Sequence, residues 1–137
     1  MPVHSRFIMT AGIFGFLGVA SGAFGAHELK QMLSPDLLAI FTTGSTYWLQ
    51  HAIVLLIVSL YQQQEQNQWL HRACWSFTIG ICIFSGSLWT LALTNTRWLG
   101  AITPFGGLAL LWGWSCIVLY TRQKMREDHA HAHDSNK

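Results

Sequence analysis

The sequence has little charge, and its few charged residues are confined to short segments. Asp, Glu, Lys and Arg make up 10% of its 137 residues, against about 25% in ordinary soluble domains. Four stretches contain none of them: 7–26, 37–64, 73–96 and 99–121. A bilayer core of about 30 Å is crossed by roughly 20 helical residues, so each stretch is long enough. The sequence therefore predicts an all-α integral membrane four-helix bundle, with helices near 7–26, 43–61, 74–93 and 99–121.

This composition also excludes other classes of protein. The net charge is +2 and the basic residues are scattered, so no basic surface for nucleic acid is expected and the predicted partner is the lipid bilayer. The three cysteines, Cys74, Cys82 and Cys116, are odd in number and lie in or beside apolar stretches, which is typical of buried thiols. Their spacing matches no recognised metal site, and we expect neither a metal nor a cofactor.

Two segments lie outside the predicted spans. Ser34-Pro35-Asp36 has the pattern of a helix start, and the apolar residues after it predict a short interfacial amphipathic segment that runs into the second helix, with Gly44 at the bend. Residues 1–121 thus form the membrane domain. Residues 122–137 are predicted to be a polar, His-rich, disordered tail. Its alternating His129, His131 and His133 either bind a metal weakly or are simply solvated.

The basic residues predict the topology. Four spans place both termini on one side, with Arg6, Arg72, Arg122, Lys124 and Arg126, whereas Lys30 and Arg97 lie on the other. Because cytoplasmic segments are richer in Lys and Arg, the termini are predicted to be cytoplasmic.

The alternative for the first stretch, with Ser21-Gly22-Ala23 near its end, is a secretory signal. The stretch is longer than the roughly 7–15 residues of a signal core, which favours a membrane span.

Small residues recur along the predicted helices. Gly15, Gly18 and Gly22 follow one face of the first helix, Gly80 lies in the third, and Gly106 and Gly113 share a face of the fourth. Within lipid, helices associate by close packing, which small residues permit. These glycines pack the bundle internally or form a homo-oligomer, and their spacing does not separate the two.

Polar residues inside the spans are the candidate site. His51 lies in the middle of the second helix, with Gln50 beside it and Tyr47 one turn earlier, and His27 ends the first helix. A polar group at that depth is costly, so it should face the bundle and find a partner. His27, Tyr47, Gln50 and His51 could form a ligand or proton site. The alternative is a structural hydrogen bond from His51 to a backbone carbonyl or to a hydroxyl of the third helix.

Several of these residues together resemble a known family. The pieces are Gly22-Ala23-Phe24-Gly25-Ala26-His27, Tyr47 with His51, Phe84-Ser85-Gly86-Ser87-Leu88 with Ala92-Leu93, Thr103-Pro104-x-Gly106-Gly107, and Gly113-Trp114. In order and spacing, over roughly residues 6–121, the sequence resembles the small bacterial inner-membrane proteins typified by YgdD, whose eukaryotic relatives include transmembrane protein 256.

The resemblance implies a four-helix protein of the bacterial plasma membrane with no established biochemical activity, and therefore no catalytic residue. One position departs from the pattern: some relatives have Gln directly after the tyrosine, whereas Trp48 follows Tyr47 here and the glutamine is Gln50.

The expected function is a non-enzymatic structural or accessory membrane component, acting as a homo-oligomer or with a membrane-protein partner. The alternative is a small transporter or proton pathway that uses the intramembrane histidines. A membrane enzyme is the least favoured class, because no nucleophile–base pair is apparent.

Overall fold

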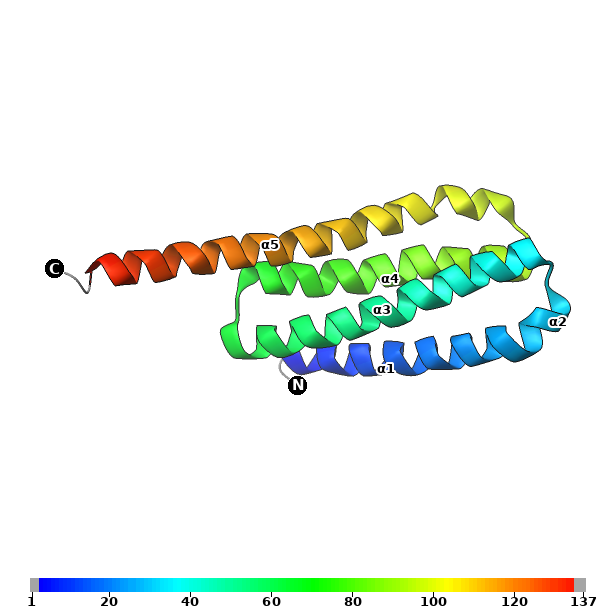
Figure 1. Cartoon of the computed structure of the whole chain (residues 1–137), viewed down its shortest axis with the longest axis horizontal. Coiled ribbons are helices and arrows are strands. Elements are labelled where there is room, and N and C mark those ends of the chain that lie inside the picture. Colours follow the sequence, from blue (N-terminus) through cyan, green and yellow to red (C-terminus); the bar gives the residue numbers. More distant parts are fainter. Residues whose placement is uncertain (1–2, 135–137) are drawn as a thin grey trace.

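The chain is a bundle of long antiparallel helices, seen side by side in Figure 1. The computed structural model describes residues 3–134. Its elements are α1 (Val3–Phe24), a π-helical turn (Gly25–Leu29), α2 (Lys30–Met32), α3 (Pro35–Glu65), α4 (Gln68–Thr94), a 3₁₀ turn (Arg97–Ala101) and α5 (Thr103–Asp134). Four helical units are long and apolar enough to cross a membrane. The predicted all-α, four-helix membrane architecture is confirmed.

Two helices begin earlier than predicted, because charge marks the membrane boundary whereas hydrogen bonds determine where a helix begins. The Ser34 hydroxyl accepts from the Leu37 amide at 3.4 Å, so α3 begins at Pro35 and not near 43. The predicted interfacial segment is therefore the first part of α3, which continues through Gly44. The Asn67 side chain accepts from the Trp69 amide at 2.8 Å, so α4 begins at Gln68 and not near 74.

The first and fourth spans also differ at their ends. The segment Gly25–Leu29 forms the π-helical turn and carries the first helical unit on to Met32 instead of ending it at 26. Before the last helix, Arg97–Ala101 forms a 3₁₀ turn, and α5 begins at Thr103 instead of 99.

The tail is helical where the structure describes it, which corrects the prediction of disorder from residue 122. α5 continues to Asp134; residues 135–137 lie outside the described part. Arg, Gln, Lys, Met, Glu and Ala are strong helix formers, and this segment is rich in them. Gln123 also donates to Glu127 one turn later at 2.8 Å, which supports the helix further.

The helices pack in the order α1, α3, α4, α5. α3 and α4 are the inner helices, with 44% and 39% of their most apolar windows buried, against 22% for the windows of the outer units. Leu55 on α3 and Phe77, Ile81 and Cys74 on α4 are fully buried, as is Cys116 on α5. Within residues 3–134, α1 and α5 do not form a packed pair. The outer surfaces of both therefore face away from the bundle.

The glycines divide into two groups by what surrounds them. A Cβ on Gly18 would lie 3.0 Å from Leu49 on α3, and one on Gly113 would lie 2.8 Å from the Phe77 ring on α4. Gly80 and Gly106 are tighter still, at the contact between α4 and α5. These four glycines lie where small residues let helix backbones approach closely.

Gly15 and Gly22 differ, because no other group lies within 4 Å of where their Cβ would be. For these two the structure does not support packing inside the bundle. Gly12, one turn before Gly15, is equally open. The spacing in the sequence put Gly15, Gly18 and Gly22 on one face. Of these, Gly18 packs directly against α3, and Gly22 lines a hollow between α1 and α3.

Replacing Gly106 by alanine should destabilise the bundle, because the new methyl group would overlap the backbone of Phe84. Overpacking of this kind lowers the free energy of unfolding by about 1–3 kcal/mol. Gly15→Ala is the matched control; it should leave stability unchanged or slightly raised, since alanine is the better helix former. Thermal unfolding in detergent micelles measures both. Equal stability of the two variants would contradict the assigned close contact.

Candidate intramembrane site around His51

The four polar side chains predicted for the site do not all meet. Tyr47, Gln50 and His51 lie on adjoining turns of α3 and line one hollow. His27 lies exposed in the π-helical turn after α1. Its neighbour Gly25 packs against Phe41, and the stretch of α3 from Phe41 to His51 measures about 15 Å at 1.5 Å per residue. His27 is therefore separate from the other three.

His51 is 8% exposed, and both of its ring nitrogens have partners. Nδ1 lies 2.9 Å from the carbonyl oxygen of Tyr47. Because a carbonyl can only accept, Nδ1 must be the donor. The other nitrogen, Nε2, accepts from the indole Nε1 of Trp114 on α5 at 3.3 Å. This assignment gives a neutral imidazole protonated on Nδ1, and protonation of Nε2 would remove the acceptor that Trp114 uses.

Aromatic rings enclose the imidazole of His51. The Tyr47 ring stacks on it with centroids 5.7 Å apart, and Phe77 and Trp114 lie 6.0 and 6.3 Å away. Phe77 and Trp114 also meet edge to face at 5.7 Å. These rings come from α3, α4 and α5. His51 thus lies at the point where three helices converge, and the surrounding rings restrict its orientation.

The bond between Trp114 and His51 is one of three similar bridges. Trp48 on α3 donates its indole N–H to the carbonyl of Phe14 on α1 at 2.7 Å. Trp89 on α4 donates to the Ser45 hydroxyl on α3 at 3.0 Å. Each bridge joins two helices inside the membrane domain, and α3 takes part in every one. Trp48 is the residue that departs from the expected glutamine, and here it ties α3 to α1.

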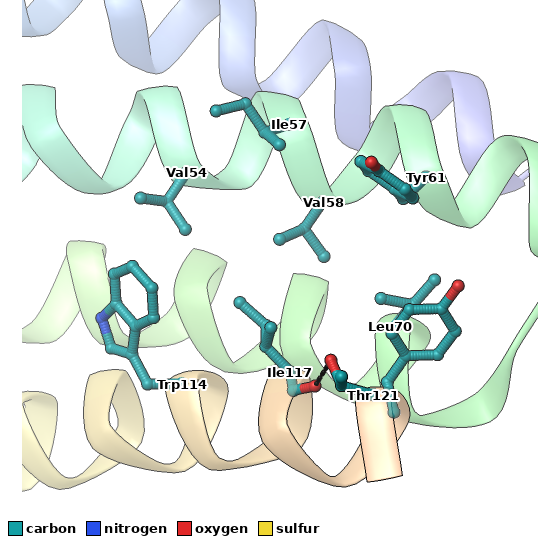
Figure 2. A pocket seen from close by; sticks show the side chains of 9 residues that line it. Val54, Ile57, Val58, Tyr61, Leu70, Trp114, Ile117 and Thr121 are labelled. Carbon is teal, nitrogen blue, oxygen red and sulfur yellow. Dashed lines mark hydrogen bonds between the residues drawn. The ribbon is translucent and has the colours of Figure 1, made fainter. Parts of the chain in front are cut away.

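A groove runs between α3 and α5, with α4 as its floor. Trp114 divides it into two hollows. The larger, about 670 Å³, is an open hollow lined by Tyr47, Gln50 and His51 of α3, by Phe84 of α4 and by residues of α5. The smaller, about 350 Å³, is lined mostly by apolar side chains and also by Tyr120, with Tyr61 and Thr121 toward one end (Figure 2). Both volumes lie within the roughly 300–1,000 Å³ range of small-molecule pockets.

Sequence reasoning missed the role of Trp114. A signal for it was present, because a tryptophan inside a span, away from the interfacial belts, has an N–H that needs an acceptor. The sequence did not reveal that His51, 63 positions away in the chain, would supply that acceptor. The predicted alternative of a structural bond from His51 to a backbone carbonyl corresponds to the bond at Tyr47.

Other groups considered from the sequence lie elsewhere. Cys74 and Cys116 are buried and Cys82 is exposed, all as free thiols. Ser87 shares a hydrogen bond of 2.8 Å with Thr103 where α5 begins. Across the part of the chain that the structure describes, no three His, Cys, Asp or Glu residues cluster as metal ligands would. The side chain of His133 lies outside the described residues.

The fold and the buried polar bridges define a small polytopic helical membrane protein. The family described as "Protein of unknown function (DUF423)" matches residues 21–107. A "UPF0382 membrane protein" of Staphylococcus epidermidis is 39% identical over 115 residues, which cover 84% of this chain and 93% of the relative. The "UPF0382 inner membrane protein YgdD" of Escherichia coli K12 is 33% identical over 128 residues, which cover 93% of this chain and 98% of YgdD.

The chain therefore belongs to this uncharacterised membrane-protein family, as its resemblance to YgdD implied. No solved structure matches it.

Changing Trp114 to phenylalanine should destabilise the protein, because it removes the N–H donor and leaves His51 Nε2 unpaired while keeping an aromatic ring. The expected loss in the free energy of unfolding is about 0.6 kcal/mol and at most about 1.7 kcal/mol, the average and the largest values for hydrogen bonds between membrane helices. Trp112→Phe is the matched control, since Trp112 is half exposed on the same helix. Unfolding measured in mixed micelles compares the two. An equal effect in both variants would argue against the bridge.

Proposed function

We propose that this chain is a non-enzymatic structural or accessory component of the bacterial inner membrane. The observation that carries the proposal is the use of both His51 ring nitrogens in structural hydrogen bonds, one within α3 to the Tyr47 carbonyl and one that joins α3 to Trp114 on α5. A free imidazole nitrogen would be needed for acid–base work or for binding a substrate. Hydrogen bonds between helices are also the ordinary role of polar side chains in membrane bundles.

The proposed orientation places both termini in the cytoplasm. The start of α1, the α3–α4 turn and the end of α5 lie at the same end of the bundle (Figure 1). Arg6, Arg72 and the basic residues of the tail belong to this end, whereas Lys30 and Arg97 belong to the other. The excess of positive charge supports a cytoplasmic location for the first end.

The proposed partner is a second copy of the chain or another membrane protein. Support comes from the part of α1 turned away from α3, where Gly12 and Gly15 have open space around them. Large apolar side chains such as Phe16 and Val19 are exposed on the same helix. A helix with this mixture can accept another helix at close range, although lipid alone can also cover it.

Transport is the second candidate function, and the larger hollow is the observation that favours it. That hollow brings Tyr47, Gln50 and His51 together beside a space of about 670 Å³. For His51 to carry a proton there, Nε2 would have to release Trp114. His27 lies away from the hollow, so the group of four residues considered from the sequence does not form one path.

Reconstitution into lipid vesicles separates the two functions. The accessory role predicts proton flux in wild-type vesicles equal to that of protein-free vesicles, measured with a trapped pH-sensitive dye. It also predicts that His51→Ala lowers thermal stability, because Trp114 and the Tyr47 carbonyl lose their partner.

The control is His27→Ala, which changes an exposed histidine outside the hollow. Under the accessory role this variant should match the wild type in both stability and flux. Flux above background that disappears in His51→Ala and persists in His27→Ala would replace the accessory role by transport.

A further inference from the structure

The last part of α5 continues past the other helices at one end of the bundle (Figure 1). Two contacts attach it to the α3–α4 turn: Lys124 forms an ion pair with Glu65 at 2.8 Å, and the Asn67 side chain donates to Gln123 at 3.4 Å. Both contacts use one side of the helix. The opposite side of this segment has no helix beside it.

On this segment the outer face carries basic side chains without acidic neighbours, and the acidic side chains lie on the inner side. Arg122, Arg126 and His129 are spaced by four and three residues, so they share the outer face. With Met125 they line a hollow of about 370 Å³ that has no acidic side chain in its lining. The acids belong to the inner side: Glu127 accepts from Gln123, and Asp128 lies one helical turn after Lys124.

The two arginines of the outer face have no acidic partner. Among the described residues, the ion pair formed by Lys124 and Glu65 is the only one. The guanidinium group presents a planar fork of N–H donors that fits two phosphate oxygens. His129 Nδ1 donates to the Met125 carbonyl at 2.6 Å, which leaves Nε2 for an outside partner. The hollow thus offers several donors and uncompensated positive charge.

The depth of this face matches the lipid headgroups. Leu111 and Val118, both largely exposed, lie on the same side of α5 and lead into Arg122. The uncharged stretch ends at residue 121, so Arg122 lies at the edge of the hydrocarbon. At 1.5 Å per residue Arg126 is about 6 Å farther out. A headgroup layer is roughly 5–7.5 Å deep, half the difference between total and hydrocarbon thickness.

We propose that the outer face of α5 binds an anionic phospholipid. Arg122 and Arg126 bind its phosphate, and the acyl chains lie along Val118 and Leu111. His129, about 10 Å beyond Arg122 along the helix, lies on the aqueous side of the headgroup. An anionic lipid fits better than a zwitterionic one, because no carboxylate in the hollow can receive the ammonium group of a choline or ethanolamine headgroup.

Native mass spectrometry of the full-length protein, released from nanodiscs of equal phosphatidylglycerol and phosphatidylcholine, tests this site. The wild type should retain phosphatidylglycerol preferentially. The double variant Arg122→Gln/Arg126→Gln should lose retention roughly 10- to 30-fold, as expected when two arginines near a charged membrane surface are neutralised. Both arginines are exposed and outside the packed core, and circular dichroism checks that the variant remains folded.

The matched control is Lys30→Gln/Arg97→Gln, which removes two exposed positive charges at the other end of the bundle. It should keep the preference for phosphatidylglycerol. An equal loss in both double variants, or no preference in the wild type, would overturn the proposal. Titration with inorganic phosphate is the last arm: a site that binds free phosphate as well as it binds the lipid would be a soluble-anion site and not a lipid site.

Discussion

Hydrogen bonds from three indole N–H groups through one helix are the interaction on which this bundle depends. Within lipid, burying apolar surface does not draw helices together, and packing and polar bridges have to do so. Trp48, Trp89 and Trp114 each donate across a helix boundary, and α3 takes part every time. Trp48 and Trp89 also stack with ring centroids 4.5 Å apart. α3 is thus the helix to which the other three are tied.

The bridge between Trp114 and His51 depends on close packing at two glycines of α5. α5 approaches α4 at Gly106 and Gly113, where no side chain larger than hydrogen fits without a shift of its neighbours. The Phe77 ring packs against Gly113, and it also borders His51 and Trp114. A wider spacing of α5 would therefore move the indole of Trp114 away from His51. Packing and hydrogen bonding at this point are parts of the same constraint.

The number of membrane spans follows from the membrane environment and could be predicted from the sequence. The helix starts and the partner of His51 could not, because local capping bonds and residues distant in the chain determine them. Long uncharged stretches identified four spans because charge is excluded from hydrocarbon. Ser34 and Asn67 fixed helix starts that charge could not locate. The tail is helical because Gln123, Glu127 and their neighbours support one another, which its polarity alone did not reveal. His51 was recognised as needing a partner, but Trp114 becomes that partner only through the register of α5 on α4.

We propose that His51 is a structural acceptor inside the membrane, held in the Nδ1–H form between Tyr47 and Trp114. The most direct test is ¹⁵N nuclear magnetic resonance of His51 in lipid nanodiscs, where the two ring nitrogens report which one carries the proton. The hydrogen bonds predict a proton on Nδ1 and none on Nε2, with Nε2 altered in Trp114→Phe and unaltered in Trp112→Phe. A proton on Nε2, alone or together with Nδ1, would contradict the bridge and return His51 to the candidates for proton or ligand chemistry.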